Sequence, residues 1–417
     1  MSLLLHGGVD GAGEPLKLRA DSVSGTFLDA SVQLEATGED ELLDCTGMVL
    51  LPAPAEPHAH LDKALSAGRV DNPGGDLAGA VEAWRVHRPT LTEGDVLARA
   101  RTAAHELIAH GATAIRSHVD VGPGIGLKGV HALVALREEL HREGLADLQL
   151  VALASVPLSG AEGAINRAWL DEAMEAGCDV VGGCPHLDPD PPGASAGAFD
   201  LAVRLGRPID LHTDETLNPA ARGLCDLVGS VAASDFSHGA VASHCVSLGV
   251  QDPERQALIA RAVAAAGVAI VTLPQTNLYL QARGLGTSPP RGLTAVRALL
   301  DAGACVAAGA DNVRDPFNCV GRSDPLETAA LLVMAAHLTP AEAWEAVSAG
   351  ARKAMGLPPG RLEAGQPAEI LAVRGTDLAD AVARASEHRI VVHAGRCVSH
   401  TQVTGALQPL PSTPVLT

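Results

Sequence analysis

The chain has 417 residues, 47% of them hydrophobic, and a formal net charge of −19 that comes from 30 basic and 49 acidic residues. This length allows two or three domains with sizeable cores, and it excludes a single small module. The excess of negative charge repels phosphate backbones and anionic lipid head groups, so we expect no nucleic acid and no membrane as partners.

Cysteine usage and the N-terminal segment bear on the cellular compartment. The eight cysteines are scattered and include no Cys-x-x-Cys pair, which indicates reduced thiols and not a disulfide framework. The first residues lack the basic region of a signal peptide, and no apolar run approaches the roughly 18 residues that a membrane span needs. We therefore expect a cytoplasmic protein.

The first predicted elements along the chain are short strands. Residues 1–52 contain short apolar runs separated by Gly, Pro, Asp and Glu, and residues 361–404 repeat this pattern. We expect the chain ends, residues 1–52 and 357–417, to form one small β-sandwich domain. Residues 53–356 would then form a second domain inserted between them.

The middle of the chain alternates strand-like apolar runs with helical stretches, which predicts an α/β fold with a parallel sheet. There are eight such runs, the strand number of a (β/α)8 TIM-type barrel. They extend from Val49 to His60, Ala112 to Val121, Leu148 to Pro157, Asp179 to Leu187, Pro208 to Glu215, Gly239 to Val246, Val268 to Asn277 and Cys305 to Asp311.

Capping residues mark the helices between these runs. Thr92 and Asp252 each precede an apolar pattern with a spacing of three to four residues, as N-caps do. Glycines such as Gly144, Gly206 and Gly267 stand between a helical stretch and the next strand. A doubly wound open sheet would instead want a Gly-x-Gly-x-x-Gly turn after the first strand, and none follows His60.

Polar side chains end several of the predicted strands, and active sites of such barrels lie at the C-terminal ends of the strands. His58 and His60 end the first run and share one strand face, so both imidazoles can reach one metal ion. The fifth run ends at His212 with Glu215 close behind, the sixth ends near His244, and the eighth ends at Asp311. Three histidines and one carboxylate, with a further Glu and His, indicate a hydrolytic metal site.

At this point the sequence resembles the amidohydrolase superfamily, and within it the cytosine deaminase-like branch. The resemblance extends over nearly the whole chain. It is carried by the split β-domain and by the segments 58–62, 116–121, 180–186, 212–215, 242–244, 277–283 and 311–316.

The resemblance implies a role for each strand-end residue. His58, His60, His212 and Asp311 would be the metal ligands, Glu215 the proton shuttle, and His244 the group that orients the attacking water. Asp311 would also accept a proton from that water, which counts it among the catalytic residues together with Glu215 and His244.

The implied cofactor is one divalent metal ion, Zn or Fe, because imidazole and carboxylate ligands suit borderline metals. Related hydrolases with two metals often hold a carboxylated lysine at the end of the fourth strand. That strand reads Val180 to Cys184 here and contains no lysine, which favours a single ion. The expected activity is that of a hydrolase acting on C–N bonds other than peptide bonds, a deaminase of an amino-substituted N-heterocycle.

Three positions depart from the cytosine deaminase pattern. Ser155 stands where those enzymes carry a glutamine that reads the pyrimidine edge, Asn312 replaces an aspartate, and Phe317 replaces the usual tryptophan. A serine cannot present a paired donor and acceptor at the same reach. We therefore expect a substrate other than cytosine, such as a substituted pyrimidine, triazine or imidazolone, which fills the space beside Ser155.

Other polar residues remain open between two roles. His118, Asp120 and His186 lie at strand ends, where they contact substrate or brace loops. Gln281 and Arg283 contact substrate or face solvent on a loop. We include Ser155, His118, Asp120, His186, Gln281, Asn312 and Phe317 as substrate-binding candidates.

Rival functions are also open. Lys63 or Lys128 could form a Schiff base in an aldolase-like enzyme, although this leaves the His and Asp set without a role. The same barrel could cleave a cyclic amide C–N bond, or bind a heterocycle without catalysis. The expected partner is a small N-heterocyclic substrate, and association into a homo-oligomer stays open.

Overall fold

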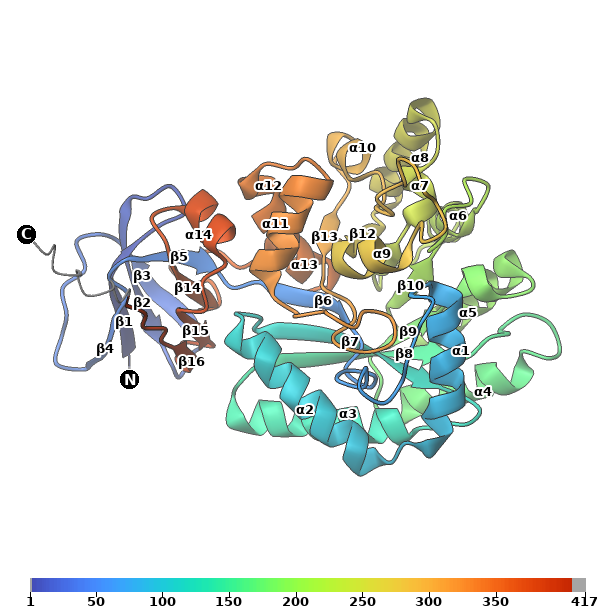
Figure 1. Cartoon of the computed structure of the whole chain (residues 1–417). Coiled ribbons are helices and arrows are strands. Elements are labelled where there is room, and N and C mark those ends of the chain that lie inside the picture. The colour runs from blue at the N-terminus through green and yellow to red at the C-terminus, as the bar shows by residue number, and fades with distance from the viewer. Residues whose placement is uncertain (1, 407–417) are drawn as a thin grey trace, which may run out of the picture.

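The computed structural model describes residues 2–406, in which eight parallel strands form the core of the larger domain (Figure 1). Each predicted apolar run of this region contains one of them. The strands are β6 Ala55–Ala59, β7 Ala114–Val121, β8 Asp147–Ala154, β9 Val180–Gly183, β10 Ile209–Thr213, β11 Ala240–His244, β12 Ala269–Thr272 and β13 Val306–Ala308.

The strands follow one another in the sheet in chain order from β6 to β13, as a TIM-type barrel requires. A parallel bridge between Ala59 and Asp311 joins the first strand to the segment after the last one, so the sheet closes into a barrel. This confirms the predicted (β/α)8 fold. Closure also brings the C-terminal ends of β6 and β13 side by side.

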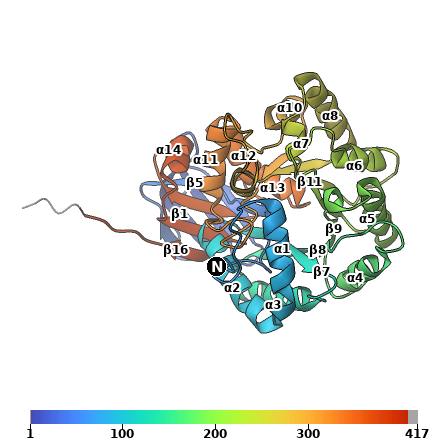
Figure 2. The same cartoon turned by 45° about the vertical axis from the view of Figure 1, so that its right-hand side comes forward.

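Helices surround the barrel (Figures 1 and 2). One of them, α1 Leu77–His87, lies in the long segment between β6 and β7. The others are α2 Glu93–Ala109, α3 Lys128–Glu143, α4 Ala164–Glu175, α5 Pro191–Leu205, α6 Gly223–Ala232, α7 Val246–Gly249, α8 Pro253–Ala266, α9 Pro274–Leu280, α10 Val296–Asp301, α11 Pro325–Ala335, α12 Pro340–Val347 and α13 Ala349–Ala354, with short 3-10 turns at Arg88–Thr90 and Pro185–Leu187.

The predicted caps occur at the helix ends. Thr92 accepts a hydrogen bond from the Asp95 amide at the start of α2, and Asp252 does the same for Arg255 in α8. Gly206 ends α5 with φ 61°, a left-handed conformation that a side chain would disfavour. Local signals therefore position the elements that carry the strand-end residues.

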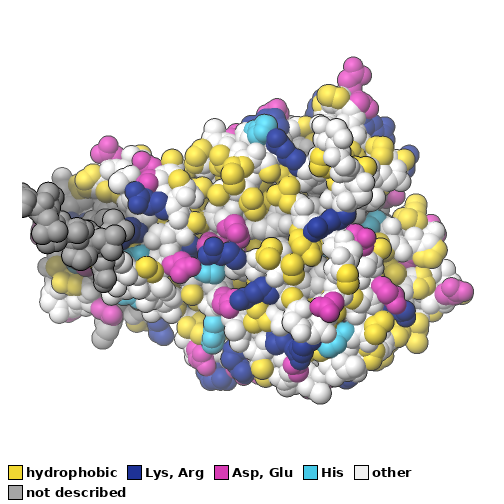
Figure 3. Space-filling model, in the orientation of Figure 1, with side chains coloured by type: hydrophobic (Ala, Val, Ile, Leu, Met, Phe, Trp, Pro, Cys, Tyr) yellow, Lys and Arg dark blue, Asp and Glu magenta, His cyan; other side chains and the backbone are white. Residues whose placement is uncertain are grey.

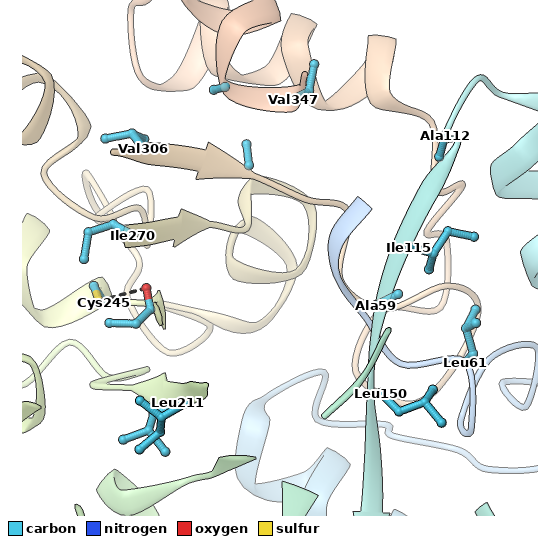
Figure 4. Packing of buried hydrophobic residues seen from close by; sticks show 14 of the residues in the cluster. Ala59, Leu61, Ala112, Ile115, Leu150, Leu211, Cys245, Ile270, Val306 and Val347 are labelled. Carbon is cyan, nitrogen blue, oxygen red and sulfur yellow. Dashed lines mark hydrogen bonds between the residues drawn. The ribbon is translucent and has the colours of Figure 1, made fainter. Parts of the chain in front are cut away.

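Apolar side chains of the strands pack against the surrounding helices and form the main core. Ile115 of β7, Ile270 of β12, Val306 of β13 and Val347 of α12 belong to one buried cluster, and Figure 4 shows Ile270 and Val306 on neighbouring strands. Because every strand contributes to this cluster, the strand ends are held on a rigid frame.

The small domain is built from both chain ends, which lie together on the left of Figure 1. Its mixed sheet has the order β16-β15-β14-β5-β1-β2-β3, and β4 pairs with β1. The strands are β1 Ser2–Val9, β2 Pro15–Asp21, β3 Thr26–Ala30, β4 Asp40–Asp44, β5 Met48–Pro52, β14 Ile370–Arg374, β15 Arg389–His393 and β16 Arg396–Thr401.

The core of the small domain lies on one face of this sheet. Leu5, Leu18, Phe27, Ile370 and Val392 come from five strands and form one buried cluster, so the sheet bends around them. The predicted small domain extends to residue 417, and its residues after 406 lie outside the described part of the chain.

The expectations from the sequence differ from the structure at two places in this domain. The apolar run from Val49 to His60 is not one strand, because β5 belongs to the small sheet and β6 to the barrel. Pro52 and Pro54 lack an amide donor, which explains why the chain leaves one ladder before it joins the next. A short helix, α14 Leu378–Arg384, follows β14 in a region where we predict only strands.

The surface and the thiols complete this description. Basic and acidic side chains are interspersed on the face shown in Figure 3. All eight cysteines are free thiols, as the scattered spacing predicts. Among residues 2–406, no helix combines the length and the apolar character that crossing a membrane requires.

Candidate active site

Four side chains in or just after three different strands converge at the C-terminal end of the barrel. The Nε2 atom of His212 lies 3.2 Å from Nε2 of His58 and 3.2 Å from Nε2 of His60. An oxygen of Asp311 lies 3.3 Å from Nε2 of His60 and 3.7 Å from Nε2 of His58. All four residues are buried, so the predicted ligand set forms one compact cluster.

This cluster fits a divalent metal ion. Ligands that each lie about 2.1 Å from one ion are separated by distances of this size. Both carboxylate oxygens of Asp311 are buried without a hydrogen-bond partner. Burial, with the neighbouring charges, lowers the pKa of His58, His60 and His212, and neutral imidazoles are the form that binds metal.

Two titratable side chains, His244 and Glu215, lie next to the cluster. His244, the last residue of β11, has its Nε2 3.9 Å from Asp311 and its Nδ1 3.6 Å from the carboxylate of Glu215. The Asn277 side-chain amide lies 3.2 Å from Nδ1 of His244 and orients the ring. Burial raises the pKa of Glu215 to about 8, so this carboxyl holds a proton at neutral pH and can give it away.

Two of these residues have strained backbones. His244 has φ 68° and Asp311 has φ 66°, values in the left-handed region that few residues other than glycine adopt. Such strain costs about 1–3 kcal/mol at each residue and persists only where the surroundings enforce it. Both residues lie where the candidate chemistry takes place.

A cavity opens beside the cluster, and its walls are mostly apolar. Asp120, Ser155, Asn312 and Phe317, four of the predicted substrate-binding residues, line it. The remaining lining residues are His60, Lys63, Leu77, Val81, Trp84, Arg85, Arg88, Leu153, Ala154, Val156, Cys184, Leu187, His212, Glu215, His244, Thr276, Leu280 and Asp311. Trp84, Phe317 and the leucines suit a flat ring.

The structure places the other predicted substrate-binding residues elsewhere. His186 and Gln281 line an outer chamber, and Nδ1 of His186 bonds the carbonyl oxygen of His212. His118 lines neither cavity. Its ring packs 3.9 Å from that of His58, centroid to centroid, and both its nitrogens are buried without a partner. His118 can also join His58 and His212 as a nitrogen ligand.

The Ser155 hydroxyl donates to the carbonyl oxygen of Val121 over 3.0 Å. Its hydrogen is therefore already used, and only its lone pairs face the cavity.

Two groups behind the ligands did not stand out in the sequence. Glu56 is fully buried and accepts hydrogen bonds from the amides of His58 and Ala310, so it joins the two strand ends that carry ligands. Burial raises the pKa of Glu56 to about 8. The sequence signal that could have identified it is a glutamate two residues before His58, inside an apolar run.

The second group orients His58 through hydrogen bonds. Asp210 accepts from Arg116 and from the Ser243 hydroxyl, each over 3.0 Å, and the Ser243 oxygen lies 3.0 Å from Nδ1 of His58. Contacts of this kind fix the ring so that the other nitrogen faces the metal position. All of these residues are in or beside the strand segments that carry the resemblance, but their pairing depends on the barrel.

A buried charge network also lines this cavity. Lys63 contacts Asp120 over 2.7 Å and Asp62 over 3.1 Å, and Asp120 also accepts from the indole of Trp84 over 2.7 Å. Burial alone would lower the pKa of Lys63, but the two carboxylates outweigh it and raise this pKa. A lysine that stays protonated is no nucleophile, which disfavours the aldolase-like alternative.

The fold and the site together define a barrel hydrolase with a metal-binding strand-end cluster, and the family comparison agrees. Residues 80–399 match the amidohydrolase family. The chain therefore belongs to the amidohydrolase family, whose members are metal-dependent hydrolases.

Individual relatives are deaminases and amine-releasing hydrolases. The chain is 30% identical over 392 residues to a pterin deaminase of Rhizobium rhizogenes (strain K84 / ATCC BAA-868), with 92% of this chain and 89% of that protein covered. Its structure resembles a 5-methylcytosine deaminase from Klebsiella pneumoniae liganded with 5-fluorocytosine, with TM-score 0.87, 26% identity and coverage of 98% and 100% of the two chains.

A third relative is an N-isopropylammelide isopropylaminohydrolase from Burkholderia multivorans ATCC 17616. The TM-score is 0.83 at 29% identity, over 96% of this chain and 98% of that one. The names of these three proteins describe the removal of an amino or alkylamino group, from a different ring in each.

Proposed function

We propose that this protein is a metal-dependent deaminase that releases ammonia or an amine from an amino-substituted N-heterocycle larger than cytosine. The observation that carries the proposal is the convergence of His58, His60, His212 and Asp311 beside a largely apolar cavity that Glu215 lines. A pterin is the first substrate to test, because one relative of similar length is a pterin deaminase.

The four converging residues would hold one Zn or Fe ion, which supplies a water of lowered pKa for attack on the ring carbon. Asp311, with both oxygens free of hydrogen bonds, accepts a proton from the attacking water. His244 orients that water, and Asn277 holds the ring of His244 in place.

Glu215 carries protons between the water and the ring. Its carboxyl holds a proton at neutral pH because burial raises its pKa to about 8, so it can protonate a ring nitrogen. The carboxylate that results takes the second proton of the water and gives it to the departing amine, and the first proton, held by Asp311, then restores the Glu215 carboxyl. The atoms balance as the addition of one water and the release of one ammonia or amine.

The size of the substrate follows from the two cavities. Leu77, Val81, Val156, Leu187 and Leu280 line both the inner cavity and the outer chamber, so the two spaces adjoin. A ring substituent or a second fused ring can extend from the inner cavity into the chamber. Ser155, whose hydroxyl is already bonded to Val121, cannot offer a paired donor and acceptor to the edge of cytosine that would face it.

The test is amine release from a panel of rings by protein loaded with Zn or Fe. The panel comprises cytosine, 5-methylcytosine, N-isopropylammelide and pterin, and kcat/KM is measured for each. We expect a fused or substituted ring to exceed cytosine by about tenfold to a hundredfold, the cost of one unpaired polar edge. Release from none of these rings, or cytosine as the best substrate, would overturn the proposal.

A further inference from the structure

Lys63 is a buried cation on the wall of the substrate cavity. The chain has four lysines, all in the described part of the chain, and Lys63 alone among them is buried. It lines the cavity together with Asp120 and Trp84. The proposed chemistry uses none of these three residues, although burying charge is costly unless it is paired.

Lys63 and Asp120 can form further hydrogen bonds with a ligand. The Lys63 ammonium has three N–H donors. One donates to Asp120 over 2.7 Å, and the contacts with Asp62 are longer, 3.1 Å to one oxygen and 3.4 Å to the other. In Asp120, one oxygen accepts from Lys63 and the other from Trp84, and each oxygen has a further lone pair. The third N–H of Lys63 is therefore engaged only by the 3.4 Å contact with Asp62, which a ligand acceptor can replace, and Asp120 retains at least one acceptor.

The spacing of the donor and the acceptor identifies what they can bind. The Lys63 nitrogen and the Asp120 oxygen are 2.7 Å apart. In a ring lactam, the carbonyl oxygen and the adjacent nitrogen are separated by about 2.2 Å, from standard amide bond lengths. A donor and an acceptor this close can face a lactam C=O and N–H side by side.

We propose that Lys63 and Asp120 together recognise a lactam edge, the ring carbonyl accepting from Lys63 and the adjacent ring N–H donating to Asp120. This rests on the proposed function and deepens it, because it restricts the substrate to amino-heterocycles that carry a ring C=O beside a ring N–H. Pterin has such an edge, and 2,4-diaminopteridine lacks it.

The charges of the network disfavour a different ligand. Lys63 brings one positive charge, and Asp62 and Asp120 bring two carboxylates within 3.1 Å of it. A carboxylate or phosphate ligand would meet this acidic excess, whereas a neutral lactam offers both a donor and an acceptor. Asp62 is held separately, since it also accepts the backbone amide of Asp120.

Trp84 acts through Asp120 as a positioning residue. Its indole N–H holds one carboxylate oxygen, which turns the other oxygen toward Lys63. Trp84 is on α1, which lies outside the ring of barrel strands (Figure 2). The orientation of the Asp120 carboxylate on the cavity wall therefore depends on α1, and not on the strands whose ends carry His58, His60 and His212.

The first experiment uses the metal-loaded wild-type protein and two substrates. We measure kcat/KM for loss of the 2-amino group from pterin and from 2,4-diaminopteridine, and we identify each product. The expected preference for pterin is about tenfold to a hundredfold. A preference below threefold overturns the lactam assignment and leaves the deaminase proposal standing.

The second experiment uses Lys63→Met, with Lys353→Met on the exposed face of α13 as the matched control. The preference for pterin should fall below threefold in Lys63→Met through a rise in KM, and the control should match the wild type. Asp120→Asn, which leaves Lys63 paired with Asp62, should give the same loss and covers the case in which Lys63→Met does not fold. A preference kept in either folded variant contradicts the proposal.

Binding separates this inference from the proposed function. Lumazine and uracil carry the lactam and lack the amino group, so their dissociation constants are measured by calorimetry without turnover. We expect at least tenfold weaker binding to Asp120→Asn than to the wild type. If no ring in the panel releases an amine, the deaminase proposal fails, while lumazine and uracil still test the lactam site. Unchanged binding, or no binding to the wild type, overturns the inference.

Discussion

Charged side chains are buried both at the barrel mouth and at the junction between the two domains, but they differ in their hydrogen-bond partners. At the mouth, both oxygens of Asp311 and one oxygen of Glu215 have no hydrogen-bond partner. At the junction, Arg389 of β15 makes two bonds of 2.9 and 2.7 Å to Asp324, the N-cap of α11. The guanidinium of Arg389 also donates to the carbonyl oxygen of His110.

This difference distinguishes sites from structural contacts. An unpaired buried polar group costs about 1–3 kcal/mol, so a cluster of such groups beside a cavity is a candidate for completion by a ligand or a reaction. A buried ion pair with every donor satisfied joins elements and leaves nothing for a ligand. The partners of a buried charge therefore say more about its role than its burial does.

The largest expected effect is at the ligand set. We expect the wild-type protein to hold about one Zn or Fe ion per chain. Asp311→Asn should lose that ion and its activity together, because it removes the charge that completes the four-residue set. Elemental analysis and amine release measure this. Two tightly held ions in the wild type, or an active Asp311→Asn, would contradict the assignment.

The next effect separates the proton carrier from the ligands. Glu215→Gln should keep its metal and lose about 10²- to 10⁴-fold in kcat, because only the proton transfer is removed. Metal content and single-substrate kinetics on the same preparation test it. If kcat stays within a few-fold of the wild type, Glu215 is not the proton carrier.

The junction should respond in stability and not in chemistry. Arg389→Met leaves the buried Asp324 carboxylate without its cationic partner and with only the Leu326 amide as a donor to it, which should destabilise the fold by about 3–5 kcal/mol. Urea unfolding measures this, and kcat of the folded enzyme should be unchanged. Arg384→Met is the matched control, because Arg384 pairs with Asp380 on the exposed surface of α14, where such a pair contributes about 0.3–0.5 kcal/mol. Equal losses in the two variants would contradict the comparison.

The smallest expected effect is a pH dependence in the small domain. Burial alone would lower the pKa of His393, but the 2.9 Å contact with Glu369 outweighs it and raises this pKa. A raised folded-state pKa gives stability that is full below the unfolded pKa, near 6.5, and is lost as pH rises through the folded value.

Thermal unfolding from pH 6 to pH 9 tests this pH dependence. The difference in Tm between the wild type and His393→Gln should shrink as pH rises, and it should stay below the effect of Arg389→Met. A difference that grows with pH would show that the charged form of His393 does not stabilise the fold.

The sequence by itself determined the order of elements and the edge of the sheet where the chemistry lies. Strand and helix patterns depend on neighbours within a few residues, so the eight barrel strands and caps such as Thr92 could be predicted. Because parallel strands bring their C-terminal ends to one side, the sequence alone was enough to assign His58, His60 and His212 to one cluster. Nothing in this local pattern says which polar groups meet across the barrel.

Only the tertiary structure decided the partners of the buried polar groups. Lys63 meets Asp120 across 57 positions of the chain, and Arg389 meets Asp324 across 65. Such pairings depend on closure of the barrel and on the position of α1, for which no short-range periodicity exists. His118 is a further example, because its ring packs against that of His58 and does not line the cavity. A position at a strand end restricts where a side chain can lie, but it does not determine which residue the side chain contacts.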